Sequence, residues 1–491
     1  MTTYTPVIGM EVHVELKTKS KMFCDSCNGL GLEKEPNIHI CPVCTGQPGT
    51  LPVPNEQAIR FVQMAGLALH CELAQESKFD RKNYFYPDLP KGYQISQFDQ
   101  PLCGLGWLDV NGKKIGITRI HMEEDTGKLV HTDGSDFAQV DFNRSGVPLM
   151  ELVTEPDITS GKEARLFCQR LQQVFRYLGI SDADMEKGQM RCEVNISLFS
   201  EGQERLSGTK VEIKNLNSFR SVEKAVDFEI DRQTDCLDAG EKIVQETRGW
   251  HDGRQMTISQ RVKESAHDYR YFPEPDIPPM SFSLDYFEGL RRSLPELPDA
   301  KQKRFLEEYG ISQDNLDVVV SDKMMADYFE EVVSEVQEKI QSREIVSDEK
   351  KVVRLAANYL VSELQKHLVR EKKTVRDCGV SPENFAELVG LVADGSINSS
   401  VAQKVLDLML HGDDDDPSHI IDAHGLAQVS DVSALETIVE DVLSKNQQSV
   451  DDFKSGKENA LKFLMGQVMK ETKGAANPQV VQEILRKKIG G

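Results

Sequence analysis

The sequence predicts an α+β fold in which a mainly antiparallel sheet domain is followed by two all-α domains. Short segments within residues 1–290 alternate apolar and polar side chains, which is the pattern of strands that bury one face. A proline-rich break falls at 275–279, where prolines at three of five positions prevent regular structure. Beyond about residue 285, apolar residues recur with the spacing of helices.

The length of 491 residues suits about three domains, because a domain usually holds about 150 residues. We divide the chain into a sheet domain (1–290), a helical domain (291–411) and a helical tail domain (417–491). The acidic run Asp413–Asp416 before Pro417 is typical of a linker between the last two. A hydrophobic fraction of 39% beside 28% charged residues favours packed cores over disorder.

Three strands are the clearest elements of the first domain: Val7–Leu16, Met190–Leu198 and Thr209–Asn215. Among the helices, one begins with Ser381 as N-cap and Pro382 at its first position, and Gly395 is the expected stop. We also expect helices over 400–410, 431–443 and 457–473, and a last helix that opens at Asn477.

The composition indicates that the protein stays in the compartment where it is made. No apolar run approaches the ~20 residues that cross a bilayer, so we expect no membrane segment. Residues 1–16 resemble neither a secretory signal peptide nor an Arg/Ser-rich transit helix. Six of the ten cysteines are scattered singly, as suits a reducing cytosol. We therefore expect a cytoplasmic protein.

The other four cysteines form two pairs, Cys24-x2-Cys27 and, thirteen residues later, Cys41-x2-Cys44. This spacing is typical of a tetrahedral zinc site, because two intervening residues let a tight turn aim both thiolates at one ion. A redox pair is the alternative, but one redox site needs one pair and not two. Four protein ligands leave no coordination position open, so we expect structural zinc that braces the loop 24–44.

The predicted strands carry unusual residues on their polar faces. Glu11, His13 and Glu15 share one face of the first strand, and Glu212 and Lys214 share one face of the third. Like charges this close are unfavourable unless a cation joins them. Carboxylates with imidazole suit Mg²⁺ or Mn²⁺. A solvated face would explain any single strand, but the composition of all the strands together favours a common cation site.

Other residues narrow the class of chemistry. The basic and aromatic segment Arg81–Tyr93 could stack nucleotide bases, although a buried tyrosine cluster would look the same. Metal carboxylates beside Lys and Arg are the components of phosphoryl transfer. The chain has neither a G-x-x-x-x-G-K-[ST] loop nor the kinase signature set. From the residues alone we expect a metal-dependent phosphoryl- or nucleotidyl-transferring enzyme, in which any ATP binds in an unusual way.

Several long motifs of rare composition resemble one family of enzyme subunits. They are IGMEVHVEL (8–16), FDRKNYFYPD (79–88), HMEED (121–125), ELVTEPD (151–157), KNLNSF (214–219) and DYRYFPEPD (268–276). In these stretches the sequence resembles the B-subunit family of aspartyl/glutamyl-tRNA amidotransferases, and the resemblance extends into the C-terminal part. The four cysteines match the members of this family that carry zinc.

The resemblance implies a carbon–nitrogen ligase of protein biosynthesis with glutamine as amido donor. The B subunit would use ATP and Mg²⁺ to phosphorylate the side-chain carboxylate of Glu-tRNA(Gln) and/or Asp-tRNA(Asn). Ammonia, released from glutamine by an amidase A subunit, would displace the phosphate and leave the amide. A small C subunit would complete a heterotrimer. The chain has no Gly-Ser-Ser-rich amidase motif, which agrees with a subunit that receives ammonia.

The resemblance also implies site residues by their positions in these motifs. The implied magnesium ligands are His13, Glu124, Glu151 and Glu212, with Glu11 near them as a further catalytic residue. We add four residues that would bind phosphate or the substrate carboxylate: Lys82, Arg144, Lys214 and Asn215. Metal and lysines together would offset the charge of two anions that meet in the reaction.

The tail domain, by the same resemblance, binds the body of the misacylated tRNA. Its basic residues from about 450 onward are Lys454, Lys457, Lys462, Lys470, Lys473, Arg486, Lys487 and Lys488. This patch would supply local positive charge for phosphate binding, which the formal net charge of -22 otherwise opposes. A solvated helix face is the alternative explanation.

Two other functions stay open. A non-catalytic zinc-containing RNA-binding subunit would have no use for the Glu and His residues, so substitution of His13 or Glu124 would leave the complex active. An ATP-dependent ligase for a free amino acid would cleave ATP without tRNA and would give no role to the basic tail.

Overall fold

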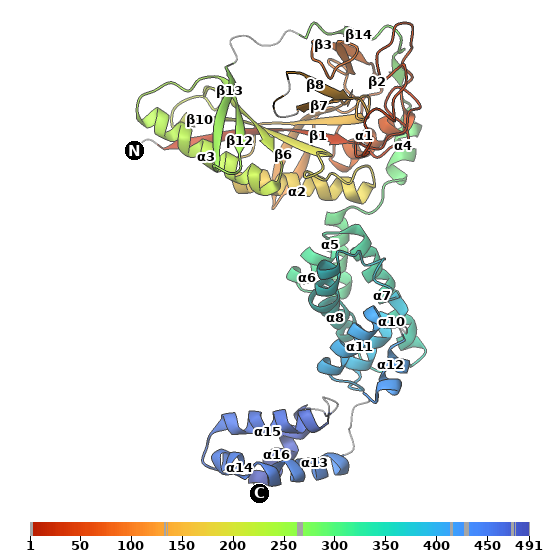
Figure 1. Ribbon diagram of the computed structural model, residues 1–491, viewed down its shortest axis with the longest axis vertical. Coiled ribbons are helices and arrows are strands. Elements are labelled where there is room, and N and C mark those ends of the chain that lie inside the picture. The colour runs from red at the N-terminus through yellow and green to blue at the C-terminus, as the bar shows by residue number, and fades with distance from the viewer. Residues whose placement is uncertain are drawn as a thin grey trace. The chain divides into compact units, whose positions relative to one another are not determined.

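The computed structural model describes residues 3–131, 134, 136–262, 269–412, 416–426, 432–472, 476 and 478–490. Contacts divide the chain into two compact units, Met1–Leu297 and Pro298–Gly491. The described strands all belong to the first unit and the second is helical (Figure 1), which confirms the predicted α+β class. Four predicted features lie outside the described residues: Asp413–Asp415 of the linker, Asp268 of the last motif, Lys473 and Asn477.

The first unit is built on a sheet of eight described strands in the order β13-β12-β11-β10-β1-β9-β6-β5. Their bounds are β1 (Tyr4–Glu15), β5 (Gly106–Val110), β6 (Lys113–Glu124), β9 (Pro148–Thr154), β10 (Met190–Ser200), β11 (Val211–Leu216), β12 (Glu246–His251) and β13 (Met256–Val262). Neighbours are antiparallel except β11 and β12, which run parallel. The three predicted strands are confirmed as β1, β10 and β11.

Helices cover one face of this sheet, because the strands direct their apolar side chains to that face. The helices α2 (Gly161–Leu178) and α3 (Phe219–Asp238) lie along it (Figure 1), and α1 (Glu56–Ala68) joins the same core. Met10 and Val12 of β1 are buried in this core. Glu11 and His13, which alternate with them, therefore belong to the opposite and polar face.

A small sheet stands beside the polar face (Figure 1). It consists of β3 (Asp80–Asn83), β4 (Tyr93–Ser96) and β14 (Phe272–Pro273). The backbone N–H of Asn83 donates to the carbonyl of Tyr269 at 2.9 Å, so the basic and aromatic segment meets a distant part of the chain. Two further pairs are β2 (Glu76–Ser77) with β15 (Met280–Ser281) and β7 (Lys128–His131) with β8 (Ala138–Asp141).

The first unit extends beyond residue 290, where we expected its end. The helix α4 (Leu284–Arg292) packs on the core of the sheet unit, in which Leu290 is 2% exposed. The hydroxyl of Tyr286 donates to Oε1 of Gln63 in α1 at 2.7 Å. The helical pattern that begins near 285 thus starts within the first unit. The sequence could not show this, because helical periodicity does not indicate which core a helix packs against.

The second unit contains helices only, among its described residues. They are α5 (Pro298–Tyr309), α6 (Gln313–Val319), α7 (Lys323–Gln341), α8 (Glu349–Tyr359), the π-helical turn η1 (Leu360–Leu364), α9 (Gln365–Glu371), α10 (Pro382–Ala393), α11 (Ser399–His411), α12 (Pro417–His424), α13 (Val432–Lys445), α14 (Gln447–Lys454), α15 (Glu458–Glu471) and α16 (Pro478–Gly490). No described helix is apolar over a length that would cross a membrane.

Helix signals in the sequence are confirmed in this unit. The Ser381 hydroxyl accepts a hydrogen bond from the N–H of Asn384, which fixes the start of α10, with Pro382 in its first turn. The helices predicted over 400–410, 431–443 and 457–473 correspond to α11, α13 and α15. The last four helices have a core of their own, which includes Leu464 and Leu485. A domain boundary at 411–417 stays a prediction.

Candidate active site on the polar face of the sheet

The polar face of the sheet forms one side of a cavity of about 500 Å³. Strands β1, β6, β9, β10 and β11 contribute to it, together with residues of the small sheet. Its lining is rich in charge: Glu11, His13, Lys82, Arg119, His121, Glu123, Asp125, Glu151, Arg191, Glu193, Glu212 and Lys214. So many charged groups in a folded domain require mutual pairing or a ligand, because an unpaired buried charge is costly.

The strand register places three of these side chains in one row. β9 lies between β1 and β6, so Glu151 is paired with His13 on one side and with His121 on the other. Residues paired across strands point to the same face. Oε2 of Glu151 consequently lies 3.3 Å from Nε2 of His13 and 3.3 Å from Nε2 of His121.

Glu151 belongs to two triads of possible metal ligands, Glu11–His13–Glu151 and His121–Glu123–Glu151. Within each triad the ligand atoms lie within 4.8 Å of one another. Each histidine and its second glutamate are two residues apart on one strand, so they share a face. Nδ1 of His121 is buried without a hydrogen-bond partner among the described residues. Imidazole and carboxylate donors in this arrangement fit a divalent cation such as Mg²⁺ or Mn²⁺.

The pKa shifts in these triads follow from their mutual charges. Burial opposes the charge of Glu151, but His121 and His13 outweigh it and hold the pKa of this carboxyl well below its usual range. Burial alone would lower the pKa of His121, but Glu151 and Glu123 raise it to about 9. Carboxylates and imidazoliums thus stabilise each other, and a divalent ion would take the place of the imidazolium protons.

Two lysines and Glu212 lie in the same cavity, as expected. Nζ of Lys82 is 2.9 Å from Oε1 of Glu123. Nζ of Lys214 is 2.8 Å from Oε2 of Glu193 and 3.6 Å from Oε1 of Glu212. Burial opposes the charge of Lys82, but Glu123 and Glu151 raise its pKa well above the ordinary value. Both lysines can therefore offer a cation to an anionic substrate.

The structure does not bring Glu124 to the triads. It follows Glu123 on β6 and therefore points to the other side of the strand. There its Oε1 accepts a hydrogen bond from the N–H of Ile95 at 2.9 Å and pairs with Lys91. It lines a separate cavity of about 210 Å³. In the triads, the ligands from β6 are His121 and Glu123, not Glu124. The alternation of side chains within HMEED indicates that His121 and Glu123 share a face.

Arg144 and Asn215 are not among the residues that line the cavity at Glu151, although Nε of Arg144 lies 3.8 Å from Oδ1 of Asp125, which does line it. Nε of Arg144 donates to the carbonyl of Thr126 at 3.0 Å, and its Nη2 donates to the carbonyl of Gly127 at 2.8 Å. Asn215 follows Lys214 on β11 with a φ of 63°, which interrupts the alternation of side chains along the strand. Asn215 is therefore not in the site, although it is adjacent to Lys214 in sequence.

Aromatic side chains border the cavity. The rings of Phe98 and Tyr271 are stacked, with centroids 4.3 Å apart and planes at 11°. Nζ of Lys82 lies 5.3 Å from the centre of the Tyr269 ring. Phe98 is 58% exposed, so its stack is not core packing but a surface that a flat ligand could extend. Of the predicted basic and aromatic segment, Lys82 and Tyr84 line this cavity, whereas Phe98, Tyr269 and Tyr271 come from outside the segment.

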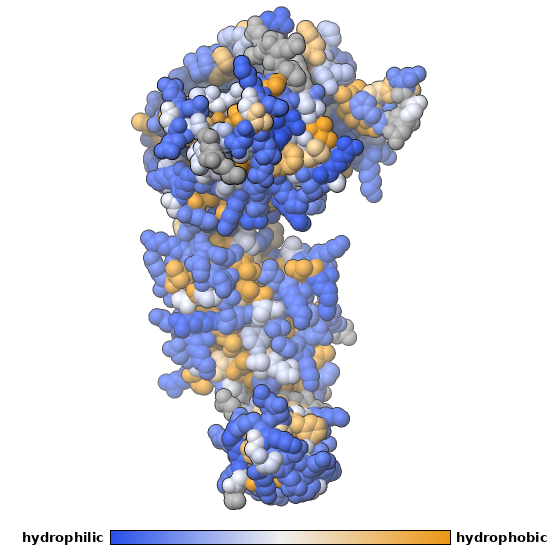
Figure 2. All heavy atoms as spheres, turned by 90° about the vertical axis from the view of Figure 1, so that its left-hand side faces the viewer, coloured by the Kyte–Doolittle hydropathy of each residue, from blue (hydrophilic) through white to orange (hydrophobic). Residues whose placement is uncertain are grey.

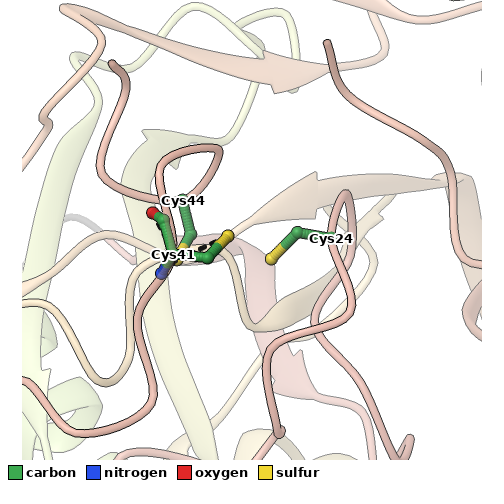
Figure 3. A group of neighbouring side chains, drawn as sticks. All are labelled: Cys24, Cys41 and Cys44. Carbon is green, nitrogen blue, oxygen red and sulfur yellow. Dashed lines mark hydrogen bonds between the residues drawn. The ribbon is translucent and has the colours of Figure 1, made fainter. Parts of the chain in front are cut away.

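Three cysteines form another group of possible metal ligands (Figure 3). The ligand atoms of Cys24, Cys41 and Cys44 lie within 4.8 Å of one another, and the Sγ atoms of Cys41 and Cys44 are 3.8 Å apart. The hydrogen bond with Cys24 lowers the pKa of the Cys44 thiol to about 4. Three thiol donors at this spacing fit zinc. Cys27, the fourth expected ligand, is exposed and lies outside this group.

The described basic residues of the tail lie in or next to α14, α15 and α16, and all of them are exposed. The visible face of these helices is predominantly hydrophilic (Figure 2). Some of the positive charge is neutralised locally. Nζ of Lys457 is 2.8 Å from Oδ1 of Asp452, and Nζ of Lys488 is 2.6 Å from Oε1 of Glu440. A phosphate ligand would have to compete with these carboxylates.

Comparison with protein families defines the class. Residues 6–288 match the family model described as GatB/GatE catalytic domain. Residues 327–489 match the family model described as GatB domain. The first match ends in α4 and the second begins in α7, so the first covers nearly all of the sheet unit with its cavity and the second covers most of the helical unit.

Relatives are similar over the whole chain. The B subunit of the aspartyl/glutamyl-tRNA(Asn/Gln) amidotransferase of Carboxydothermus hydrogenoformans is 47% identical over 496 residues, which covers 100% of this chain and 99% of that protein. Proteins of the same name from Brevibacillus brevis and Thermotoga maritima are 46% and 45% identical, each over 99% of both chains. The chain belongs to the family of aspartyl/glutamyl-tRNA(Asn/Gln) amidotransferase B subunits, which confirms the resemblance seen in the motifs.

Proposed function

We propose that this chain activates the side-chain carboxylate of Glu-tRNA(Gln) and/or Asp-tRNA(Asn) with ATP and Mg²⁺, and that ammonia then converts the activated group to the amide. The convergence of His13 and His121 on Glu151, with Lys82 beside them, carries the proposal. This arrangement lies in a cavity of about 500 Å³, a volume that suits a small-molecule ligand. The names of the relatives supply the substrate class, and the triads supply a reason for its chemistry.

The chemistry needs a site that lets two anions meet. A free carboxylate expels hydroxide poorly, whereas an acyl phosphate offers phosphate as a leaving group. Glu11, Glu123 and Glu151 with the two histidines would hold Mg²⁺, which would offset the negative charge of the phosphate groups. Lys82 and Lys214 would exchange their carboxylate partners for the incoming anions. Each lysine would thereby lower the repulsion between the phosphate and the substrate carboxylate.

The partners follow from the place of this chain in its family. A B subunit implies a complex, and we propose an amidase A subunit that supplies ammonia and a small C subunit that completes the heterotrimer. The exposed lysines of α14 to α16 would contact the tRNA backbone. Phe98 and Tyr271 would stack on a base of ATP or of the tRNA terminus, because stacking accepts any base.

Glu151→Gln in the purified complex tests the central step. We expect ATP cleavage stimulated by charged tRNA to fall by about 100-fold or more, because both triads lose their shared ligand. Glu201→Gln, at an exposed position of the same unit, is the matched control and should keep full activity. Glutamine hydrolysis by the partner should persist in both variants. Unchanged tRNA-stimulated ATP cleavage in Glu151→Gln would refute the proposal, and ATP cleavage with free glutamate alone would favour the free-amino-acid ligase.

The cysteine group would hold structural zinc, with Cys27 as the fourth ligand. Cys27 belongs to the same loop, where its backbone is bridged to Ser20. Four thiolates would close the coordination sphere and leave the ion without a part in the reaction. Metal analysis of Cys44→Ser and Cys27→Ser should show zinc well below one equivalent. Full zinc occupancy in Cys27→Ser would reduce the proposed site to three cysteines.

A further inference from the structure

Lys21 is a fully buried lysine beside the cysteine group. Its side chain is 0% exposed and is among the largest that the structure buries completely. The residue lies in the segment that leads from β1 into the loop 24–44. A buried ammonium group is costly unless an opposite charge lies close to it, so the charge of Lys21 must be offset nearby.

The neighbours of this ammonium group identify the opposite charge. Among the described residues, Nζ of Lys21 has two hydrogen-bond partners, Sγ of Cys44 at 3.8 Å and the carbonyl oxygen of Phe142 at 3.2 Å. Lys301, a buried lysine of the helical unit, instead has a carboxylate partner, with Nζ 3.0 Å from Oδ1 of Asp327. Of the two partners of Lys21, only the sulfur can carry a negative charge.

The sulfur of Cys44 has further donors around it. The backbone N–H of Cys41 donates to this sulfur at 3.2 Å, and the hydroxyl oxygen of Ser26 lies 3.9 Å from it. Cys44 is 3% exposed, so water contributes little to its surroundings. A metal-bound cysteine is a thiolate, which carries negative charge and only accepts hydrogen bonds. Protein donors directed at one buried sulfur are the surroundings that such a ligand needs.

We propose that Lys21 is the counter-cation of the zinc centre: its ammonium group donates to the Cys44 sulfur and offsets part of the negative charge of the thiolates. This inference rests on the proposed zinc site. Zn²⁺ with four thiolates is a net anion, and burial makes an uncompensated charge unfavourable. Lys21 would not touch the ion, but it would determine how firmly the ion is held, as the hydrogen-bond partners of metal ligands commonly do.

The second hydrogen bond of Lys21 connects the zinc centre to the segment that precedes β9. The acceptor is the carbonyl of Phe142, and the hydroxyl of Ser145 donates to the carbonyl of Cys44 at 2.9 Å. A Cβ atom at Gly146 would lie 3.3 Å from Cβ of Cys44, so the two segments are closely packed. Lys21 therefore joins a metal ligand to the polypeptide that leads into the strand of the two triads.

Release of zinc from the full-length chain tests this role. The chain is loaded with zinc, and an excess of the zinc-sensitive dye pyridylazoresorcinol reports each ion that it releases. We expect Lys21→Met to release zinc at least about 10-fold faster than wild type, because methionine keeps an apolar stem and removes the charge. Lys19→Met, at an exposed position of the same segment, is the matched control and should release zinc as wild type does. Circular dichroism at the assay temperature confirms that each variant is folded.

Thermal unfolding with and without zinc separates a charge effect from a packing effect. If Lys21 balances the charge of the zinc centre, Lys21→Met should lower the Tm of the zinc-loaded chain more than that of the zinc-free chain. An equal loss in both forms assigns Lys21 to packing and overturns the proposal.

The outcomes also distinguish the role of Lys21 from the existence of the zinc site. If wild type holds one equivalent of zinc and Lys21→Met releases it at the same rate, the role of Lys21 is overturned and the site stands. A zinc-loaded wild type that retains no zinc overturns both. Neither measurement involves ATP cleavage, so each result is independent of the catalytic proposal.

Discussion

Imidazole and carboxylate side chains gather in two regions of this protein, and their surroundings differ sharply. In the cavity of the sheet unit, the side chains of His121 and Glu151 are 4% and 7% exposed. The helices α9 and α11 carry the second group, His367, Glu371, Asp407 and His411, which we call the helix cluster. There the side chains of His411 and Asp407 are 39% and 57% exposed. Water screens the second group but barely reaches the first. The same residue types should therefore tolerate substitution in the helices and not in the sheet.

The two groups also differ in what positions their side chains. On the sheet, five residues of three adjacent strands are held by backbone register, which positions them before any ligand arrives. We call Glu11, His13, His121, Glu123 and Glu151 the sheet cluster. In the helix cluster, long side chains reach between two helices and depend on each other for position. A buried network whose members are fixed by the backbone is rigid, whereas an exposed one exchanges partners with solvent.

Lys82→Met should cause the largest loss of stability. It removes the cation 2.9 Å from Glu123, whose side chain is 2% exposed. An ion pair that loses one buried partner costs about 3–5 kcal/mol. The hydroxyl of Ser96 still donates to Glu123 and His121 still faces it, so we expect about 3 kcal/mol. Chemical denaturation of the purified chain measures the difference.

The double variant Lys82→Met/Glu123→Gln is the control for this prediction. With the unpaired charge removed, most of the lost stability should return, although activity should not. If the double variant is as unstable as the single one, the loss comes from packing of the lysine stem rather than from the unpaired buried charge of Glu123. Electrostatics would then no longer explain why the buried sheet cluster should be more sensitive to substitution than the exposed helix cluster.

Glu123→Gln and Glu124→Gln should differ in activity by about 10-fold or more, although the residues are adjacent. Glu123 is a ligand in one triad, so its loss should reduce tRNA-stimulated ATP cleavage by roughly 100-fold and raise the Mg²⁺ requirement. Glu124 lines the other cavity and is paired with Lys91. Its substitution should leave the Mg²⁺ requirement unchanged. A larger effect of Glu124→Gln on Mg²⁺ dependence would restore the assignment that the motif suggested.

Local patterns in the sequence predicted the strands and their faces. Alternation placed Glu11 and His13 on the polar face of β1 and Glu212 on that of β11, and each of these residues lines the cavity. Alternation depends only on backbone geometry within one strand, so a short segment suffices to show it. The zinc-binding pattern was also local, and the structure brings three of its four cysteines together.

Pairing between distant segments could not be predicted in this way. The position of β9 between β1 and β6 sets Glu151 opposite His13 and His121, and no local signal encodes that register. The motif implies Glu124 by its position, which carries no information about the face of the strand. The helix cluster has no sequence signature, because its two halves are separated by 40 residues and meet only through helix packing.

The pH dependence of the helix cluster should be the smallest effect. The hydrogen bond to Glu371 raises the pKa of His411 above its ordinary value. The pair therefore adds its full stability between about pH 4.5 and about pH 6.5, the unfolded pKa values of Glu371 and His411, and loses it as pH rises through the higher folded pKa of His411. In metal-free buffer near pH 5.5, the Tm of wild type should exceed that of His411→Gln by at most about 2 °C, since an exposed pair contributes little, and the difference should vanish in alkali. An advantage that grows as pH rises above about 6.5 would contradict the pairing of His411 with Glu371, because an imidazolium partner can only weaken as it loses its proton.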